Sequence, residues 1–233
     1  MVTADPRLQL DTLFVTDARG RIVSTREPGP SPGPAFAFVR GVSNCVWAVR
    51  ANVPEPVALE VLRLASEEVP TSAWDRPLRH AERYASLLGG RLRSGPAFVF
   101  PAELGDEGDV VAVDDEHELN HHFSGWVPGE IAAGRAPVCA VRVDGRAVSV
   151  CFCARRSAAA AEAGVETATP FRGRGFAPRA VIAWATRVRA DGLTPLYSTD
   201  GSNRASLAVA RKLGLVPFAA DFSVETGPLA YPF

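Results

Sequence analysis

The chain of 233 residues is 47% hydrophobic, enough to build the core of one large domain or of two small ones. Its formal net charge of −1 offers no global attraction to nucleic acid or to an anionic membrane, so we expect neither as a partner. No apolar run approaches the ~20 residues that a membrane span needs.

The cysteines and the N-terminus favour a reducing compartment. Cys45, Cys139, Cys151 and Cys153 have neither the spacing of a disulfide framework nor that of a zinc site. The first residues lack a basic segment followed by an apolar stretch, so no signal peptide is visible. We therefore expect a cytoplasmic protein.

The first hundred residues mix strand and helix patterns and hold no chemical motif. Strands are expected at 8–15, 21–24, 35–40, 44–50 and 97–100. Helices are expected at 54–68 and 79–88, where apolar residues recur at helical spacing. The acidic, glycine-containing stretch 103–109 then indicates a boundary. We predict an N-terminal α+β region of unknown role over 1–105 and a second domain over 106–233.

Beyond the boundary, strands and helices alternate more regularly. Strands are expected at 110–113, 137–143, 146–154, 159–168, 194–199 and 216–224. Helices are expected at 116–123, 178–190 and 203–213. Asp144-Gly145 is a strong signal for a hairpin between two of these strands. The fold class is therefore α/β, or α+β.

A loop rich in glycine and arginine, Arg172-Gly173-Arg174-Gly175, lies between a strand and a helix. The first turn of a helix leaves N–H groups unpaired and carries a partial positive charge, and glycines let a large anion approach that backbone. The loop therefore predicts a phosphate or pyrophosphate site. It lacks the third glycine of a dinucleotide fingerprint and the Gly-Lys-Ser/Thr of a Walker loop.

Two further segments accompany this loop, Ala168-Thr169-Pro170 before it and Asn203-x-x-Ser206 with Lys212-Leu213-Gly214-Leu215 after it. Together with Arg172–Ala177, they resemble motifs of the GNAT superfamily of acyl-CoA N-acyltransferases, over residues ~110–225. The resemblance implies a mixed, splayed β-sheet flanked by helices, with the pantetheine arm of acetyl-CoA in the split. The cofactor-binding residues that it implies are Thr167, Ala168, Thr169, Arg172, Gly173, Arg174, Gly175, Phe176, Ala177, Asn203 and Ser206.

Acetyl transfer to an amine needs a neutral amine, an oxyanion site near Ala168 and protonation of the leaving thiolate. Glu162 and Glu166 lie four apart on a strand and therefore share a face. Glu162 stands where the family carries its strand-borne general base, and Glu166 is the substitute candidate. The acceptor that follows is a primary amine on a small molecule or a peptide.

One position departs from the family pattern. A tyrosine on the helix after the asparagine often protonates the thiolate, and Ala210 stands there in this sequence. Tyr197, Ser198 or Ser206 then serves as the acid, or solvent does. The departure also keeps open a non-catalytic acyl-CoA-binding sensor or interaction module. The oligomeric state stays open as well, a homodimer included.

A third possible function, a zinc hydrolase, rests on His117-Glu118-Leu119-Asn120-His121, which matches the H-E-x-x-H signature of zinc proteases. On a helix, the two histidines would share a face and Glu118 would act as the base. Acidic residues precede the motif, and no histidine follows His122 as a third ligand, so we expect no metal site. In the acyltransferase reading His121, His122, Phe123 and Trp126 border the acceptor pocket. The acidic stretch 106–118 would favour a cationic amine there.

Overall fold

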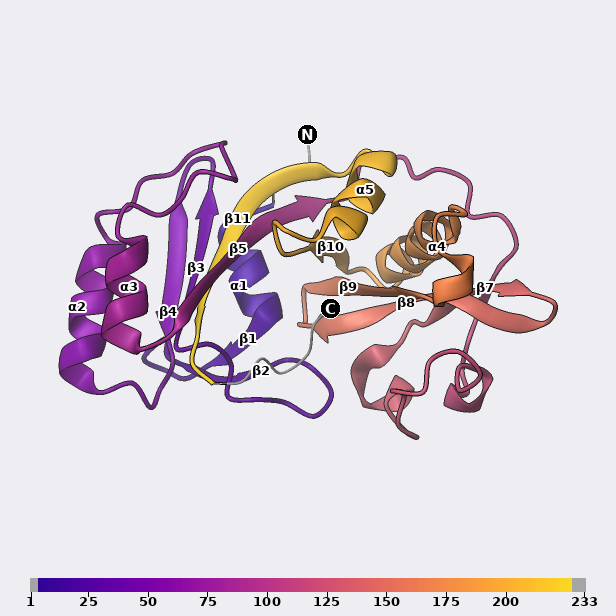
Figure 1. Ribbon diagram of the computed structural model, residues 1–233, viewed down its shortest axis with the longest axis horizontal. Helices are drawn as coiled ribbons and strands as arrows, with labels where there is room; N and C mark the ends of the chain where they lie inside the picture. Colours follow the sequence, from indigo (N-terminus) through magenta and orange to yellow (C-terminus); the bar gives the residue numbers. More distant parts are fainter. Residues whose placement is uncertain (1–3, 228–233) are drawn as a thin grey trace.

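One mixed sheet runs along the length of the molecule (Figure 1). The computed structural model describes residues 4–227. Within that range the sheet consists of β3 (Phe36–Gly41), β4 (Cys45–Val49), β5 (Arg91–Val99), β6 (Val110–Ala112), β7 (Cys139–Val143), β8 (Arg146–Arg156), β9 (Ala160–Thr167), β10 (Thr194–Ser198) and β11 (Val216–Glu225). The order across the sheet is β4-β3-β11-β5-β10-β9-β8-β7-β6. A separate antiparallel pair joins β1 (Phe14–Thr16) and β2 (Ile22–Thr25).

The sheet opens between β9 and β10. These two strands are parallel, whereas the other neighbouring pairs in the described sheet are antiparallel. Their ladder ends at Leu196↔Glu162, although β9 continues to Thr167. From Leu196 onward β10 also pairs with β5 on its other side and follows that strand away from β9. The mixed, splayed sheet flanked by helices confirms the predicted fold class.

Side-chain alternation assigns the helices to two faces of the sheet. α1 (Pro6–Leu13) packs on the face that carries Val39, Leu196 and Ala219. On the opposite face, α4 (Phe176–Ala190) and α5 (Arg204–Lys212) cover residues of β8, β9 and β10. Also opposite α1, α2 (Glu55–Ala65) and α3 (Ala81–Leu88) cover residues of β3 and β11 at the other end (Figure 1).

Strands from both predicted parts of the chain contribute to this sheet, because β5 lies between β10 and β11. Its pairing with β11 extends over Arg91 to Val99 and is the most extensive strand contact of the N-terminal part. The division of the chain near residue 105 stays a prediction. Residues 97–99 of β5 pair with β10, next to the place where the sheet opens.

The strand expected at 8–15 is wrong, because Pro6–Leu13 forms a helix. Pro6 occupies the first turn, where its missing N–H costs nothing, and Asp5 accepts a hydrogen bond from the N–H of Arg7 as the N-cap. Leu10 and Leu13, three residues apart, share the buried face. The strand begins only at Phe14. As a helix, this segment directs the side chain of Gln9 toward the sheet.

The helix expected at 116–123 is also wrong. Only Glu116–Glu118 forms a single 3-10 turn, followed by irregular turns, and a π-type turn at Ile131–Arg135 had no sequence signal. Leu119 and Phe123 bury their side chains below β7 and β8, and this anchors the segment without a continuous helix. Among the other expected elements, β5 is longer at its start than the strand predicted at 97–100, and the rest shift by a few residues at their ends.

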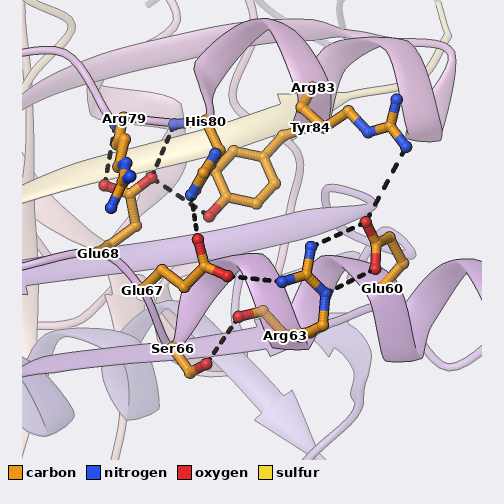
Figure 2. Close-up of polar contacts among 9 residues, drawn as sticks. All are labelled: Glu60, Arg63, Ser66, Glu67, Glu68, Arg79, His80, Arg83 and Tyr84. Atoms are coloured by element: carbon orange, nitrogen blue, oxygen red, sulfur yellow. Dashed lines mark hydrogen bonds and ion pairs between the residues drawn. The ribbon is translucent and has the colours of Figure 1, made fainter.

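Polar contacts, rather than apolar packing alone, join α2 to α3 (Figure 2). The buried Glu68 carboxylate accepts hydrogen bonds from the backbone N–H groups of Arg79 (2.9 Å) and His80 (3.0 Å) and from the Tyr84 hydroxyl (3.3 Å). Burial and the neighbouring Glu68 charge raise the pKa of Tyr84, so its hydroxyl stays a donor. Glu67 contacts His80 Nε2 at 2.8 Å. A buried carboxylate needs such donors, so these contacts account for the conformation of the helix connection.

Candidate active site in the split of the sheet

The split between β9 and β10 opens into a cavity of about 1220 Å³. The edge of β9 beyond Glu162 borders it, and the glycine loop before α4 lies at one end. Side chains from β8, β9, β10 and β11 surround the other end. The cavity therefore connects the predicted anion site with the α1 side of the sheet.

The glycine loop has the conformation that an anion site needs. Gly173 (φ 76°) and Gly175 (φ 81°) both have left-handed backbones, which glycine adopts without strain. Gly175 is the N-cap of the fifteen-residue helix α4, and it supplies no side-chain cap to the first N–H groups. A Cβ on Gly175 would lie 3.1 Å from Nζ of Lys212, so the chain's single lysine stands over the loop.

All of the predicted cofactor residues except Arg174 line the cavity. The Arg174 guanidinium instead stacks over the ring of Phe171, 5.2 Å from its centroid. Arg172 lies at the cavity and its Nε donates to the Thr167 carbonyl at 3.1 Å. The N–H of Ala168 already donates to Val148 at 2.9 Å, so the oxyanion donor expected near Ala168 has to come from another residue.

Hydroxyl groups line the cavity where α5 meets β10. The Tyr197 hydroxyl lies 2.6 Å from Oγ of Ser206, and burial raises the pKa of Tyr197 to about 12. Asn203 caps α5 by accepting a hydrogen bond from the N–H of Ser206 at 3.1 Å. Ala210 is 2% exposed and belongs to the core beneath. Tyr197 thus brings a neutral, proton-bearing hydroxyl to the cavity, whereas Ala210 brings none.

Glu162 is 2% exposed and its carboxylate is fully engaged. It accepts hydrogen bonds from Nε2 of Gln9 (3.2 Å), from Oγ of Ser198 and from Nη1 of Arg155 (2.8 Å). Arg155 also pairs with Glu27, so one guanidinium serves two carboxylates. Sequence reasoning missed Gln9 and Arg155. Gln9 stands in the segment predicted as a strand, and Arg155 lies between the strands expected at 146–154 and 159–168.

Glu166 shares the face of Glu162, as the spacing predicts, but its surroundings differ. Its side chain is exposed at the cavity wall, yet the protein around it displaces enough water to raise its pKa, and Arg135 opposes that rise. Its carboxylate has no hydrogen-bond partner within residues 4–227. The two glutamates are therefore not equivalent, since one is held by three donors and the other is unrestrained.

Asp221 on β11 is a cavity residue that sequence reasoning missed. Its Oδ2 accepts a hydrogen bond from Nε2 of Gln9 at 2.9 Å, the same nitrogen that contacts Glu162. Burial, and then the charge of Glu162, raise the pKa of Asp221 to about 7, against the smaller effects of Gln9 and Arg155. A signal was present, since an aspartate interrupts the apolar run Phe218-Ala219-Ala220 before Phe222.

The H-E-x-x-H segment does not form the helix that a zinc protease requires. Glu118 forms an ion pair with Arg142, and Nε2 of His121 lies 2.9 Å from Arg146, whose charge lowers the pKa of His121. The described part of the chain contains no group of three or more side chains suited to a metal ion. His122 and Phe123 line the main cavity, whereas His121 and Trp126 do not.

No helix within residues 4–227 is both long and apolar enough to cross a bilayer.

Residues 133–219 match the model of the family described as GNAT acetyltransferase, which confirms the resemblance drawn from the motifs. The matched segment contains the glycine loop, α4 and α5. No curated protein matches the chain.

Solved structures show similar folds at low sequence identity. A GCN5-related N-acetyltransferase from Kribbella flavida is 15% identical, with 98% of each chain covered and a TM-score of 0.50. A GCN5-related N-acetyltransferase-like protein from Streptococcus suis is 18% identical, with 82% of this chain and 84% of the other covered and a TM-score of 0.49. At these identities the similarity concerns the fold alone.

Proposed function

Because the chain carries a GNAT acetyltransferase domain over residues 133–219, we propose that it transfers the acetyl group of acetyl-CoA to a primary amine. The proposed reaction is direct attack in a ternary complex, without a covalent enzyme intermediate. The observation that carries the proposal is the continuous cavity, with a helix N-terminus and Lys212 at one end and carboxylates at the other.

The residues at the glycine loop suit the coenzyme. Its pyrophosphate would be held by N–H groups of the loop and by Lys212, in a cradle that a side chain at Gly175 would fill. The edge of β9 from Ala163 to Thr167 has no strand partner on the β10 side within the described residues, so its backbone groups can pair with the pantetheine amides. When bound, acetyl-CoA supplies an activated acyl group and a good leaving group.

The chain's own groups provide the remaining chemistry. An amine that arrives as ammonium must lose a proton before it attacks, and the predicted bases are Glu162 and Glu166. Tyr197 is the best-placed hydroxyl to hydrogen-bond and protonate the thiolate, because it reaches the cavity while keeping its proton. Ser198 is already a donor to Glu162, so its place in the site favours positioning of that carboxylate.

Acetyl-CoA binding measured by calorimetry and thiol release measured over a library of amines test the proposal. We expect micromolar-range binding, thiol release with a subset of primary amines, and about tenfold weaker binding for Gly175→Ala. The matched control is Gly145→Ala in the β7–β8 hairpin. It also puts alanine at a position with positive φ, but no atom lies within 4 Å of the new Cβ. A wild-type protein that binds no acyl-CoA refutes the proposed function.

A specific observation favours a second candidate, a sensor that binds acyl-CoA without turnover. Ala210 is buried in the core and supplies no acid from α5. This candidate shares the cavity and the coenzyme with the first. It differs in the expected result, which is coenzyme binding without thiol release for any amine of the library.

A further inference from the structure

The end of the cavity away from the glycine loop is rich in carboxylates: Glu27, Glu162, Asp200, Asp221 and Glu225. Arg155 pairs with the first two, and Arg93 pairs with Asp200 at 2.9 Å. Within residues 4–227, Asp221 has no arginine, lysine or histidine within ion-pair distance. The acidic end therefore faces a basic end at Lys212, across one cavity.

The Asp221 carboxylate is short of donors. Its Oδ1 is inaccessible to bulk water and has no hydrogen-bond partner in the described chain. Its Oδ2 shares a single amide nitrogen, Nε2 of Gln9, with Glu162. One neutral amide donates two hydrogens but brings no charge, so Asp221, unlike Glu162 with Arg155, has no cationic partner within residues 4–227. A buried carboxylate in this state favours either a proton or a cationic ligand.

Fold topology explains how these groups meet. β9 and β11 are separated by β10 and β5, and Glu162 and Asp221 point to the same face as α1. Gly95 of β5, which is the register partner of Asp221, lacks a side chain, so nothing from that strand covers the carboxylate. Gln9 reaches both acids from the helix above. The Asp221 carboxylate, half-buried as a whole, is therefore on a wall of the cavity at its acidic end.

We propose that the Asp221 carboxylate receives the ammonium group of the acceptor and takes its proton, so that the acceptors of this protein are cationic primary amines. The inference rests on the proposed acetyl transfer. In the step, one N–H bond of the ammonium breaks and an O–H bond forms on Asp221. The nitrogen keeps the electron pair and forms a C–N bond with the thioester carbonyl carbon. The C–S bond then breaks, the nitrogen loses its second proton, and the thiolate gains a proton and leaves as the thiol of coenzyme A. The carboxylic acid of Asp221 later returns its proton to solvent.

Asp221 suits this role better than Glu162. Three donors, one of them cationic, already bind the carboxyl oxygens of Glu162, which leaves that group little capacity to receive an ammonium. A base is most effective when its pKa lies near the working pH, and burial places the pKa of Asp221 at about 7. The charged groups around it are Glu162 on β9, Arg155 on β8, Arg93 on β5, Asp200 after β10, Glu27 after β2 and Glu225 on β11.

The test compares Asp221→Asn with the matched control Asp144→Asn, an exposed position in the β7–β8 hairpin. Asn keeps the volume and an acceptor oxygen for Gln9, so the variant is expected to fold. Binding of primary amines to protein saturated with coenzyme A is measured by calorimetry. We expect amine binding to become 10- to 100-fold weaker in Asp221→Asn, because the variant loses a hydrogen bond between two charged groups. Asp144→Asn should bind amines as the wild type does.

A second readout is the pH profile of kcat/KM for acetyl transfer. The wild type should gain activity as pH rises through about 7, and Asp221→Asn should lose both that inflection and most of kcat. Equal amine affinity in the two variants, or an unchanged inflection, overturns the inference. Amine binding that depends on Asp221 in a protein that releases no thiol would support this site while refuting the proposed transfer.

Discussion

Replacing Asp221 by asparagine should stabilise the protein, and by more at high pH than at low pH. The pKa of Asp221 rises from an ordinary 3.8 to about 7 in the folded state. A folded state with the higher pKa holds the proton more tightly, so it is most stable when the acid is protonated. The free energy of unfolding of the wild type should therefore fall as pH rises from about 4, until the folded group ionises near pH 7.

The size follows from linkage. At about 1.4 kcal/mol per pKa unit, the loss is about 2 kcal/mol at about pH 5 and about 4 kcal/mol at about pH 8. Asparagine carries no charge at either pH, so the gain of Asp221→Asn over the wild type should grow by about 2 to 3 kcal/mol between them. This growth does not depend on how well the amide itself packs.

Denaturant unfolding at these two pH values, followed by fluorescence or circular dichroism, measures the difference directly. The exposed control Asp144→Asn should follow the wild type at both. A gain that is the same at both pH values, within about 0.5 kcal/mol, would mean that Asp221 is ionised throughout and that its site is better solvated or better paired than the contacts indicate.

Three further outcomes are expected. A Cβ on Gly95 would lie 1.8 Å from the backbone oxygen of Thr199, in the loop after β10, so Gly95→Ala should lower the unfolding free energy by about 3 kcal/mol. Gly125→Ala, where a Cβ meets no atom within 4 Å, should change it little. Lys212→Ala should weaken acetyl-CoA binding by about tenfold in calorimetry, whereas Arg211→Ala on the same turn, outside the cavity lining, should not. Tyr197→Phe should lower kcat about tenfold with KM for acetyl-CoA unchanged, and equal loss in both would assign Tyr197 to binding.

Local chain chemistry was sufficient for the end of the cavity that holds the glycine loop. Glycines with left-handed backbones, a helix that follows at once and an asparagine cap are properties of short segments, so Gly173, Gly175 and Asn203 could be placed from sequence. The alternation along β9 placed Glu162 and Glu166 on one face for the same reason. The sequence motifs also gave the resemblance to the GNAT superfamily, and residues 133–219 match the model of that family.

The acceptor end depends on tertiary structure, because its groups come from elements far apart in the chain. Gln9 was assigned to a strand, since the alternation Leu-Gln-Leu suits a strand as well as one turn of a helix with a proline start. Glu162 on β9 and Asp221 on β11 are separated by the strands β5 and β10. The amide of Gln9 contacts both carboxylates because α1 packs over the face of the sheet to which they point. Burial by these contacts, and not residue type, raises the pKa of Asp221, and no local pattern carries that information.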